Sequence, residues 1–251
     1  MLQPRKTSEQ IDALRQGGQI LATILADLKN YVTPGMTGLS VDDWVGKQIA
    51  RHGAQPTYKE PKVNFPGNIC ISVNDQIVHS VPNERAFEAG DLIGFDLTIT
   101  FRGMKVDSAF TMLLGEEPKG AKKMLLRQTE QSLYAGIEAV RAGARVGDIS
   151  SAIEKVLKKA GLGIVRDLVG HGVGAEMHMP PEIPNYGKPG IGSVLSVGDT
   201  LAIEPMATLG NGKMRVMSNG WDVATTDGSL AAHFEHTVLV QESGAEILTQ
   251  L

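Results

Sequence analysis

A repeat with a constant offset of 108 residues constrains the fold of this chain more than any other feature of its sequence. Glycines recur at this offset at positions 35 and 143, 53 and 161, and 90 and 198. Residues 90–96 (GDLIGFD) also match residues 198–204 (GDTLAIE). Self-similarity at a fixed offset, in matching helix and strand contexts, indicates a duplicated structural unit. We therefore expect two related halves that place Asp96 and Glu204 at equivalent points of their strands.

Each half is predicted to contain two helices followed by strands. Apolar residues at helical spacing predict helices at 8–31 and 40–52, with Ser40 as the cap of the second helix, and strands at 69–73, 93–101 and 104–114. In the second half, helices are expected at 123–140 and 147–160, and strands at 164–168, 200–208, 215–218 and 235–240. This order predicts an α+β fold in a single domain over residues 1–251, with an internal repeat of roughly 8–114 and 123–240.

Composition and charge narrow the class of protein. The chain is 42% hydrophobic and 21% charged, as in ordinary globular proteins, and its formal charge of −4 argues against binding nucleic acid through phosphate contacts. No apolar run reaches the roughly 18 residues that a membrane helix needs, and the first residues lack the apolar core of a signal peptide. Cys70 is the single cysteine, so no intramolecular disulfide forms. These features predict a cytoplasmic protein with neither a membrane nor a nucleic acid as partner.

Two aspartates flank a predicted β-hairpin. With Arg102 and Gly103 at its tip, Thr98 faces Asp107, and Asp96 lies diagonally across on the same face. The other face carries an apolar set ready for a core: Ile93, Phe95, Leu97 and Ile99. Two carboxylates directed at one point are unfavourable unless a positive group lies between them. The pair is therefore a candidate cation site, although two solvated aspartates on an edge hairpin explain it equally well.

Two histidines and two glutamates extend this candidate site. His171 lies between glycines (GHGVG, 170–174), which leave the backbone free to approach a ligand, and His178 precedes two prolines. A lone histidine is more often structural, but two in one glycine- and proline-framed segment favour function. Glu204 and Glu235 lie among apolar neighbours, where a carboxylate is rarely buried unpaired. Taken singly, each glutamate is equally explained as the ion-pair partner of a Lys or Arg.

Taken together, two Asp, two Glu and one His form a set rich in hard oxygen donors. Such a set suits a pair of divalent cations such as Mn, Fe, Co or Zn better than a structural zinc site, which favours Cys and His. Two metal ions bridged by a water or hydroxide are a common device for hydrolysis.

The motifs around these residues resemble those of the type I methionine aminopeptidases, and the resemblance runs over nearly the whole chain. The matching motifs are SVN (72–74), HSVP (79–82), FDLT (95–98), VDSA (106–109), GHGVG (170–174), IEPM (203–206) and EHT (235–237). This family has the pita-bread fold, a pseudo-twofold repeat of two α+β halves around a central curved antiparallel sheet. That fold agrees with the 108-residue offset, which was found independently of the motifs.

The resemblance implies a dinuclear metal centre with five ligands. Asp107 and Glu235 would bridge two divalent metal ions (Co, Mn, Fe or Zn). Asp96 would complete one metal site, and His171 with Glu204 would complete the other.

The resemblance also implies the catalytic and substrate-binding residues. Glu204 would act as general base on the bridging water, His178 would stabilise the developing oxyanion, and His79 would contact the substrate near the scissile amide. The substrate would be the N-terminal methionine of a nascent polypeptide, followed by a small residue. The substrate-binding residues would be Phe65, Cys70, His79, Met177, His178 and Trp221. The protein is expected to be a monomer. Its expected partner is the ribosome, at a place near the exit of the nascent-chain tunnel.

Three positions depart from the family pattern. Ser80 replaces the usual glycine, Lys62 stands where an aromatic residue often closes the pocket, and Met179 replaces the more frequent glutamate. None is a proposed ligand, so these departures concern the pocket and not the reaction. Two alternatives to methionine removal remain. The chain could be a proline-directed aminopeptidase of the same fold, or a non-catalytic binding protein of that fold. Relatives of the second kind typically lose metal ligands, whereas all five are present here.

Overall fold

The computed structural model describes residues 3–251. Its helices are α1 (Ser8–Tyr31), α2 (Gly38–Arg51), the short 3-10 helix η1 (Thr57–Lys59), α3 (Gly120–Glu138) and α4 (Val146–Lys159). The strands of the first half are β1 (Gln55–Pro56), β2 (Cys70–Val73), β3 (Gln76–Val78), β4 (Leu92–Phe101) and β5 (Met104–Leu113). Those of the second half are β6 (Gly163–Ile164), β7 (Val169–Gly172), β8 (Met179–Pro184), β9 (Thr200–Ile203), β10 (Met206–Thr208), β11 (Met214–Val216), β12 (Val223–Thr225), β13 (Ala231–His233), β14 (Glu235–Gln241) and β15 (Gly244–Ile247).

Capping boxes begin α1 and α2. The side chain of Thr7 accepts a hydrogen bond from the backbone N–H of Gln10, and the side chain of Thr37 accepts one from Ser40. These bonds satisfy backbone donors that the first helical turn leaves free. The prediction that Ser40 caps the second helix is wrong, because the helix already begins at Gly38. Ser40 is instead the third residue of the helix, and its hydroxyl accepts a hydrogen bond from the backbone N–H of Thr37.

The predicted hairpin of β4 and β5 is confirmed. Arg102 and Gly103 form its tip, and both have positive φ (48° and 77°), as a type I′ turn requires. The register places Thr98 opposite Asp107 as expected. The apolar face is fully buried, at Ile93, Phe95, Leu97 and Ile99. Because side chains alternate along a strand, Asp96 and Asp107 point to the face opposite this core.

The strands of the two halves join in one sheet. Among the described residues this sheet has nine strands, with the path β1-β4-β5-β14-β9-β7-β8, β2 beside β4 and β15 beside β14. All of its pairings are antiparallel. β14 connects the halves, because Glu235 pairs with Ala109 of β5 and His236 pairs with Ile203 of β9. The strands that carry the predicted ligands are therefore neighbours.

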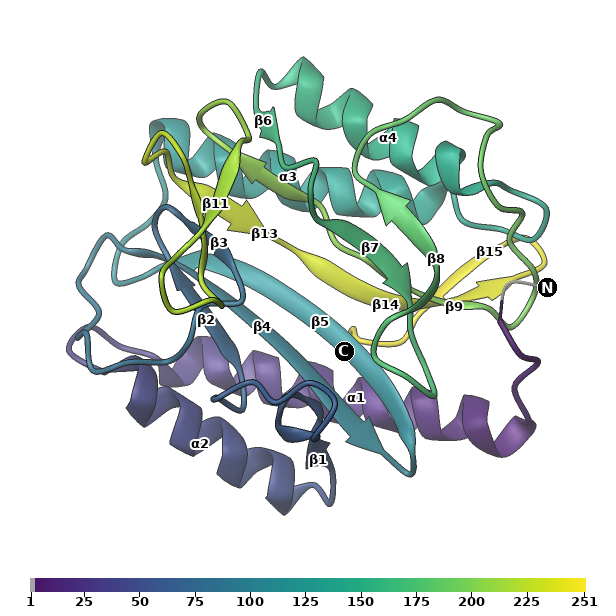
Figure 1. Cartoon of the computed structure of the whole chain (residues 1–251), viewed down its shortest axis with the longest axis horizontal. Helices are drawn as coiled ribbons and strands as arrows, with labels where there is room; N and C mark the ends of the chain where they lie inside the picture. Colours follow the sequence, from purple (N-terminus) through teal and green to yellow (C-terminus); the bar gives the residue numbers. More distant parts are fainter. Residues whose placement is uncertain (1–2) are drawn as a thin grey trace.

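Two apolar cores attach the helices to this sheet. In the first core, residues of α1 and α2 such as Leu14 and Val45 pack against Phe95 and its neighbours on β4 and β5. In the second, residues of α3 and α4 such as Leu125 and Ile149 pack with β9 and β14. Figure 1 shows α1 and α2 at one end of the view and α3 and α4 at the other, with the long strands between them. The helices thus leave the opposite face of β4 and β5 available for polar residues.

The 108-residue offset appears in the contacts as well as in the elements. α2 and α4 are both 14 residues long and begin at residues 38 and 146. The N–H of Gly35 donates to the carbonyl of Phe87, and the N–H of Gly143 donates to that of Leu195. Both glycines have positive φ (93° and 80°), which glycine adopts without steric cost. The architecture is therefore the predicted pita-bread fold.

The strands of the second half were predicted less accurately. The expected strand at 164–168 is mostly irregular, since β6 ends at Ile164 and β7 begins at Val169. The expected strand at 200–208 is broken after Ile203 and resumes at Met206, because Pro205 has no backbone N–H to donate. β8 was not predicted because it contains three prolines, which are tolerated here because β8 is the last strand on its side of the sheet.

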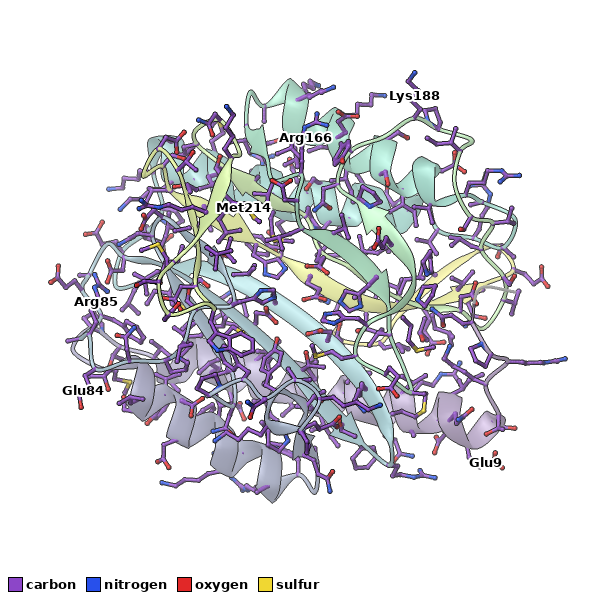
Figure 2. All side chains as sticks on the ribbon, in the orientation of Figure 1. Glu9, Glu84, Arg85, Arg166, Lys188 and Met214 are labelled. Carbon is purple, nitrogen blue, oxygen red and sulfur yellow. The ribbon has the colours of Figure 1, made fainter. Side chains whose placement is uncertain are left out.

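Charged side chains cover the outside of the molecule. Figure 2 shows the labelled side chains of Glu9, Glu84, Arg85 and Lys188 projecting from its periphery, and each is exposed. Among residues 3–251, no helix combines the length and the apolar character needed to cross a bilayer.

Candidate active site

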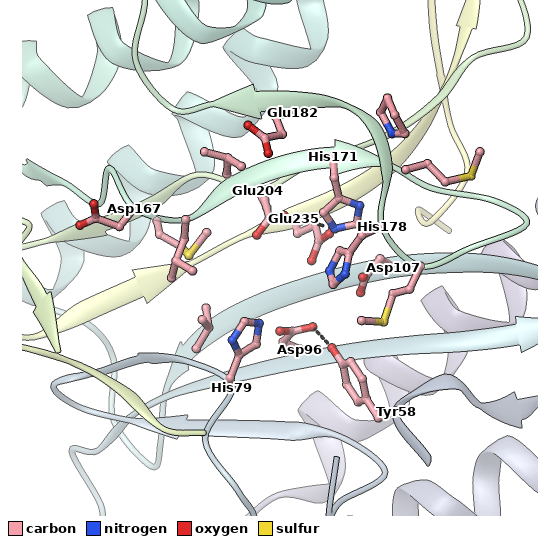
Figure 3. A pocket seen from close by; sticks show the side chains of 17 residues that line it. Tyr58, His79, Asp96, Asp107, Asp167, His171, His178, Glu182, Glu204 and Glu235 are labelled. Atoms are coloured by element: carbon pink, nitrogen blue, oxygen red, sulfur yellow. Dashed lines mark hydrogen bonds and ion pairs between the residues drawn. The ribbon is translucent and has the colours of Figure 1, made fainter. Parts of the chain in front are cut away.

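The predicted ligands come from five strands and line one cavity of about 550 Å³. Each ligand lies on or directly after a strand of the large sheet: Asp96 on β4, Asp107 on β5, His171 on β7, Glu204 after β9 and Glu235 on β14. In Figure 3, Glu204 lies on the upper side of the group and Asp96 on its lower side, with Glu235 between them and His171 and Asp107 to the right. The positions that the 108-residue offset relates, Asp96 and Glu204, therefore face each other across the cavity.

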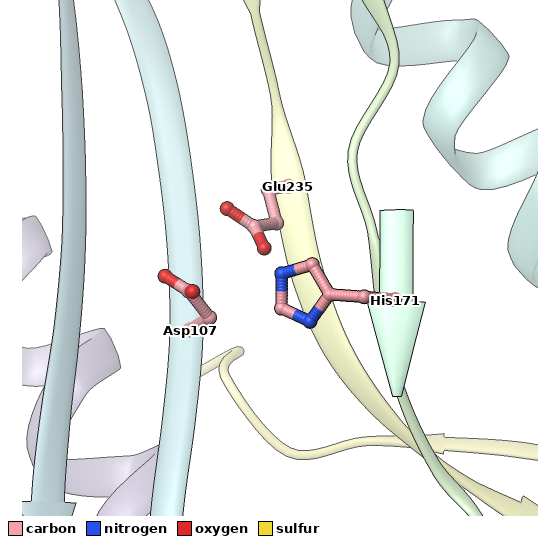
Figure 4. A group of neighbouring side chains, drawn as sticks. All are labelled: Asp107, His171 and Glu235. Carbon is pink, nitrogen blue, oxygen red and sulfur yellow. The ribbon is translucent and has the colours of Figure 1, made fainter. Parts of the chain in front are cut away.

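Asp107, His171 and Glu235 form the tightest part of this group. One ligand atom of each lies within 4.8 Å of the others, a spacing that suits a shared metal ion (Figure 4). All three residues are buried, with exposed fractions of 5%, 8% and 2%. Carboxylate oxygens with an imidazole nitrogen are a donor set used by Mn, Fe, Co and Zn.

The four central carboxylates of the cavity, those of Asp96, Asp107, Glu204 and Glu235, lie close enough to repel one another when ionised. Oδ1 of Asp107 and Oε1 of Glu235 are buried and have no hydrogen-bond partner within residues 3–251. Burial, together with the neighbouring carboxylate of Asp107, raises the pKa of Asp96 to about 8. Burial and the same repulsion also raise the pKa values of Glu204 and Glu235. Such a cluster is unfavourable by itself and is stabilised by bound cations, so these residues fit a divalent metal centre.

His171 presents a free nitrogen to this cluster. Its Nδ1 lies 2.9 Å from the carbonyl oxygen of Gly172, which only accepts, so Nδ1 carries the proton. Nε2 is then left with its lone pair, 3.4 Å from Oε1 of Glu204. Burial lowers the pKa of His171 to about 4, so the ring is neutral at pH 7. Histidines that bind a metal through one ring nitrogen typically donate a hydrogen bond from the other, as His171 does to Gly172.

His79 and His178 line the same cavity, as predicted for groups that contact substrate. The His178 ring packs edge-on against His171, with ring centroids 4.4 Å apart. Burial, followed by the neighbouring His171, lowers the pKa of His178, and burial lowers that of His79 to about 4. His79 also has a positive φ of 56°, an uncommon conformation that directs its ring into the cavity. Both rings are neutral at pH 7, and each offers one N–H donor.

An apolar cluster adjoins the cavity. Phe65 and Cys70 are buried in it with Tyr58, and Met177 and Trp221 pack against them. The rings of Phe65 and Trp221 meet edge to face, with centroids 5.2 Å apart. Tyr58 and Met177 belong to both the cluster and the cavity wall, whereas the predicted residues Phe65, Cys70 and Trp221 lie in the cluster without lining the cavity.

Comparison with known proteins identifies the family. Residues 12–242 match the profile of metallopeptidase family M24. The chain is 40% identical to the methionine aminopeptidase of Clostridium perfringens over 97% of both chains. The chain belongs to the methionine aminopeptidases of family M24.

Solved structures agree with this assignment. The methionine aminopeptidase of Thermotoga maritima superimposes with a TM-score of 0.95 at 37% identity and covers both chains completely. A prolidase from Pyrococcus furiosus matches with a TM-score of 0.77 at 22% identity, over 98% of this chain and 65% of its own, and shows the shared fold.

Tyr58 is a cavity residue of this aminopeptidase that sequence reasoning missed. Its hydroxyl donates a 2.6 Å hydrogen bond to Oδ1 of Asp96 (Figure 3). Burial raises the pKa of the Tyr58 phenol, so the group stays protonated and acts as a donor. The available signal was one tyrosine in a loop rich in proline and lysine, and nothing local indicated that the loop folds over β4.

Tyr58→Phe is expected to weaken Mn²⁺ binding by about tenfold, because it removes a bond that orients a ligand. Calorimetric titration of chelator-treated protein measures this change. Tyr31→Phe is the matched control, because Tyr31 stacks on Trp44 in the first helix pair and does not line the cavity. Equal affinities for the wild type and Tyr58→Phe would contradict a role for Tyr58 in holding Asp96.

The three departures from the family pattern differ in their relation to the cavity. The ammonium of Lys62 pairs with Glu176 at 2.9 Å and links the loop before Phe65 to the segment that carries Met177. Both partners are exposed, so solvent screens the pair and it contributes little to stability. Ser80 is fully buried and its hydroxyl has no partner within the described residues, and Met179 lines the cavity.

Two further acidic residues, Asp167 and Glu182, line the cavity but stand apart from the central group in Figure 3. They belong to its rim and are not part of the ligand set.

Proposed function

We propose that this methionine aminopeptidase hydrolyses the first peptide bond of its substrate at a pair of divalent metal ions held by Asp96, Asp107, His171, Glu204 and Glu235. The observation that carries the proposal is the buried acidic cluster, in which Oδ1 of Asp107 and Oε1 of Glu235 have no partner within residues 3–251. A protein gains nothing from burying such groups unless a cation compensates them.

The ligands divide between two positions. Asp107 and Glu235 would contribute to both metal positions, Asp96 to one, and His171 with Glu204 to the other. When bound, the ions supply Lewis acidity and activate a water for attack. The free amino group of the substrate is directed to the same centre, so only the N-terminal residue is removed.

The side chains around the centre transfer protons and stabilise charge. Glu204 accepts the proton of the attacking water and passes it to the departing amine. An N–H of His178 stabilises the oxyanion that forms at the scissile carbonyl, and His79 donates to the substrate near the scissile amide. Both imidazoles suit these roles because burial keeps them neutral donors at pH 7.

The apolar cluster supplies the pocket for the methionine side chain. Met177 and Tyr58 form the wall shared with the cavity, and Phe65, Cys70 and Trp221 support it. Apolar and sulfur-bearing groups suit a flexible thioether. The substrates are nascent polypeptides whose second residue is small, and the enzyme works as a cytoplasmic monomer near the ribosomal exit tunnel.

Metal removal and replacement test this proposal. Chelator-treated protein is expected to lose methionine release from Met-Ala-Ser, and titration with Mn²⁺ is expected to restore it with two ions bound per chain. Binding also raises the melting temperature, because an ion at 100 times its Kd stabilises the folded state by about 2.7 kcal/mol. Full activity of protein shown by elemental analysis to be free of metal would contradict the proposal.

A further inference from the structure

A sixth side chain, His233 at the end of β13, faces the carboxylates of the metal centre. It is 3% exposed, and its Nε2 is buried without a hydrogen-bond partner in the part of the chain that the structure describes. This nitrogen lies 3.8 Å from Oε2 of Glu204 and 3.8 Å from Oε2 of Glu235. A buried polar atom without a partner calls for a physical explanation, because leaving it unbonded costs about 1–3 kcal/mol.

The backbone holds His233 firmly in this place. Its N–H donates to the hydroxyl of Thr111, which donates in turn to the carbonyl oxygen of His233, both at 2.9 Å. On the other side, His233 pairs with Met206 of β10, two residues after Glu204. The backbone of His233 is thus attached both to β5, which carries Asp107, and to the strand that follows Glu204.

In both Glu204 and Glu235, the two carboxylate oxygens have different neighbours. Oε2 of each faces His233. Oε1 of Glu204 instead lies 3.4 Å from Nε2 of His171, and Oε1 of Glu235 is buried without a partner. One oxygen of each carboxylate therefore faces His233, and the other is left for the metal centre.

The atoms around the His233 ring indicate which of its nitrogens carries the proton. Both oxygens next to Nε2 belong to carboxylates. When bound metal ions keep these carboxylates ionised, they only accept hydrogen bonds and so favour the tautomer that carries its proton on Nε2. A distance of 3.8 Å exceeds the roughly 3.2 Å limit of an N–H···O bond, and a shift of less than about 1 Å in either carboxylate closes it.

We propose that His233 is a positioning residue of the metal centre. Its Nε2–H holds the Oε2 atoms of Glu204 and Glu235, and so keeps their Oε1 atoms directed at the metal ions. The inference rests on the proposed ligand set. It adds to that set a residue that binds no metal itself but sets the affinity of the site for metal.

Two substitutions of His233 separate this role from simple packing. His233→Leu removes the donor, and His233→Gln keeps an amide N–H close to the place of Nε2. In calorimetric titrations of chelator-treated protein, His233→Leu is expected to bind Mn²⁺ 10- to 100-fold more weakly, the usual effect of removing a hydrogen-bond partner of a metal ligand. His233→Gln is expected to stay within about threefold of the wild type, since the donor is retained.

His236→Leu is the matched control. His236 is a half-buried histidine three residues away that bonds instead to Thr249 and Tyr134. Its replacement is expected to lower the melting temperature without changing the affinity for Mn²⁺. If His233→Leu does not fold, as judged by circular dichroism, His233→Asn serves in its place, because its shorter amide does not reach the position of Nε2.

The outcomes separate this inference from the proposed function. Wild-type affinity in His233→Leu, or an equal loss in His233→Gln and His233→Leu, would overturn the role of His233 while the metal centre stands. A wild-type protein that binds no Mn²⁺ would overturn the metal centre, and the role of His233 with it.

Discussion

Asp107→Asn is expected to lower kcat/KM for methionine release by several orders of magnitude, even at saturating metal. Asparagine has the shape of aspartate but lacks its charge, so it cannot serve as an anionic bridge between two cations. His171→Ala is expected to have an effect of similar size, because it removes the one nitrogen ligand of the set. Steady-state hydrolysis of Met-Ala-Ser at saturating Mn²⁺ measures both.

The fold should survive these changes. In the metal-free protein, Asp107→Asn relieves repulsion within the acidic cluster, so its melting temperature should equal or exceed that of the metal-free wild type. Asp43→Asn is the control, because Asp43 is an exposed carboxylate that pairs with Lys47 on α2. Near-normal hydrolysis by either ligand variant would show that the proposed ligand set is wrong.

His178→Ala is expected to lower kcat by about a hundredfold or more, the size of effect seen when one oxyanion donor is removed. Because His178 is not a proposed ligand, the affinity for Mn²⁺ should change much less than kcat. Parallel titration and kinetics separate the two effects. An unchanged kcat would leave His178 as a residue that merely packs against His171.

The parts of the fold that local sequence determines were predicted well. The hairpin of β4 and β5 was anticipated with its register, because its turn residues and its alternating apolar face are both encoded within a dozen positions. That register alone places Asp96 and Asp107 on one face of the hairpin. The capping residue of α2 was misassigned because Thr37 and Ser40 both carry hydroxyls, and only the box geometry distinguishes them.

The parts of the site that depend on tertiary contacts were not predictable. Tyr58 reaches Asp96 only because the loop after β1 folds over β4. His233 faces Glu204 only because β13 pairs with β10, and both of these strands are three residues long. Local patterns do not define such short strands, so no periodicity in the sequence indicated that His233 faces the metal centre.

The duplication explains why the site lies at the middle of the molecule. Asp96 and Glu204 occupy equivalent positions of the two halves and face each other across the cavity, and β5 and β14 pair between them. Each half alone has part of the ligand set, and only their union through β14 assembles the five side chains. The family resemblance assigned the roles, and the sheet order gives the physical reason why these distant residues meet.

The most direct test of the central claim compares two peptides, Met-Ala-Ser and Ala-Pro-Ala, after chelator treatment and re-addition of Mn, Co, Fe or Zn. The proposed centre predicts metal-dependent release of methionine from the first peptide and no cleavage of the second. Cleavage of Ala-Pro-Ala would instead indicate a proline-directed aminopeptidase, and no cleavage of either peptide with any metal would contradict the catalytic role of the site.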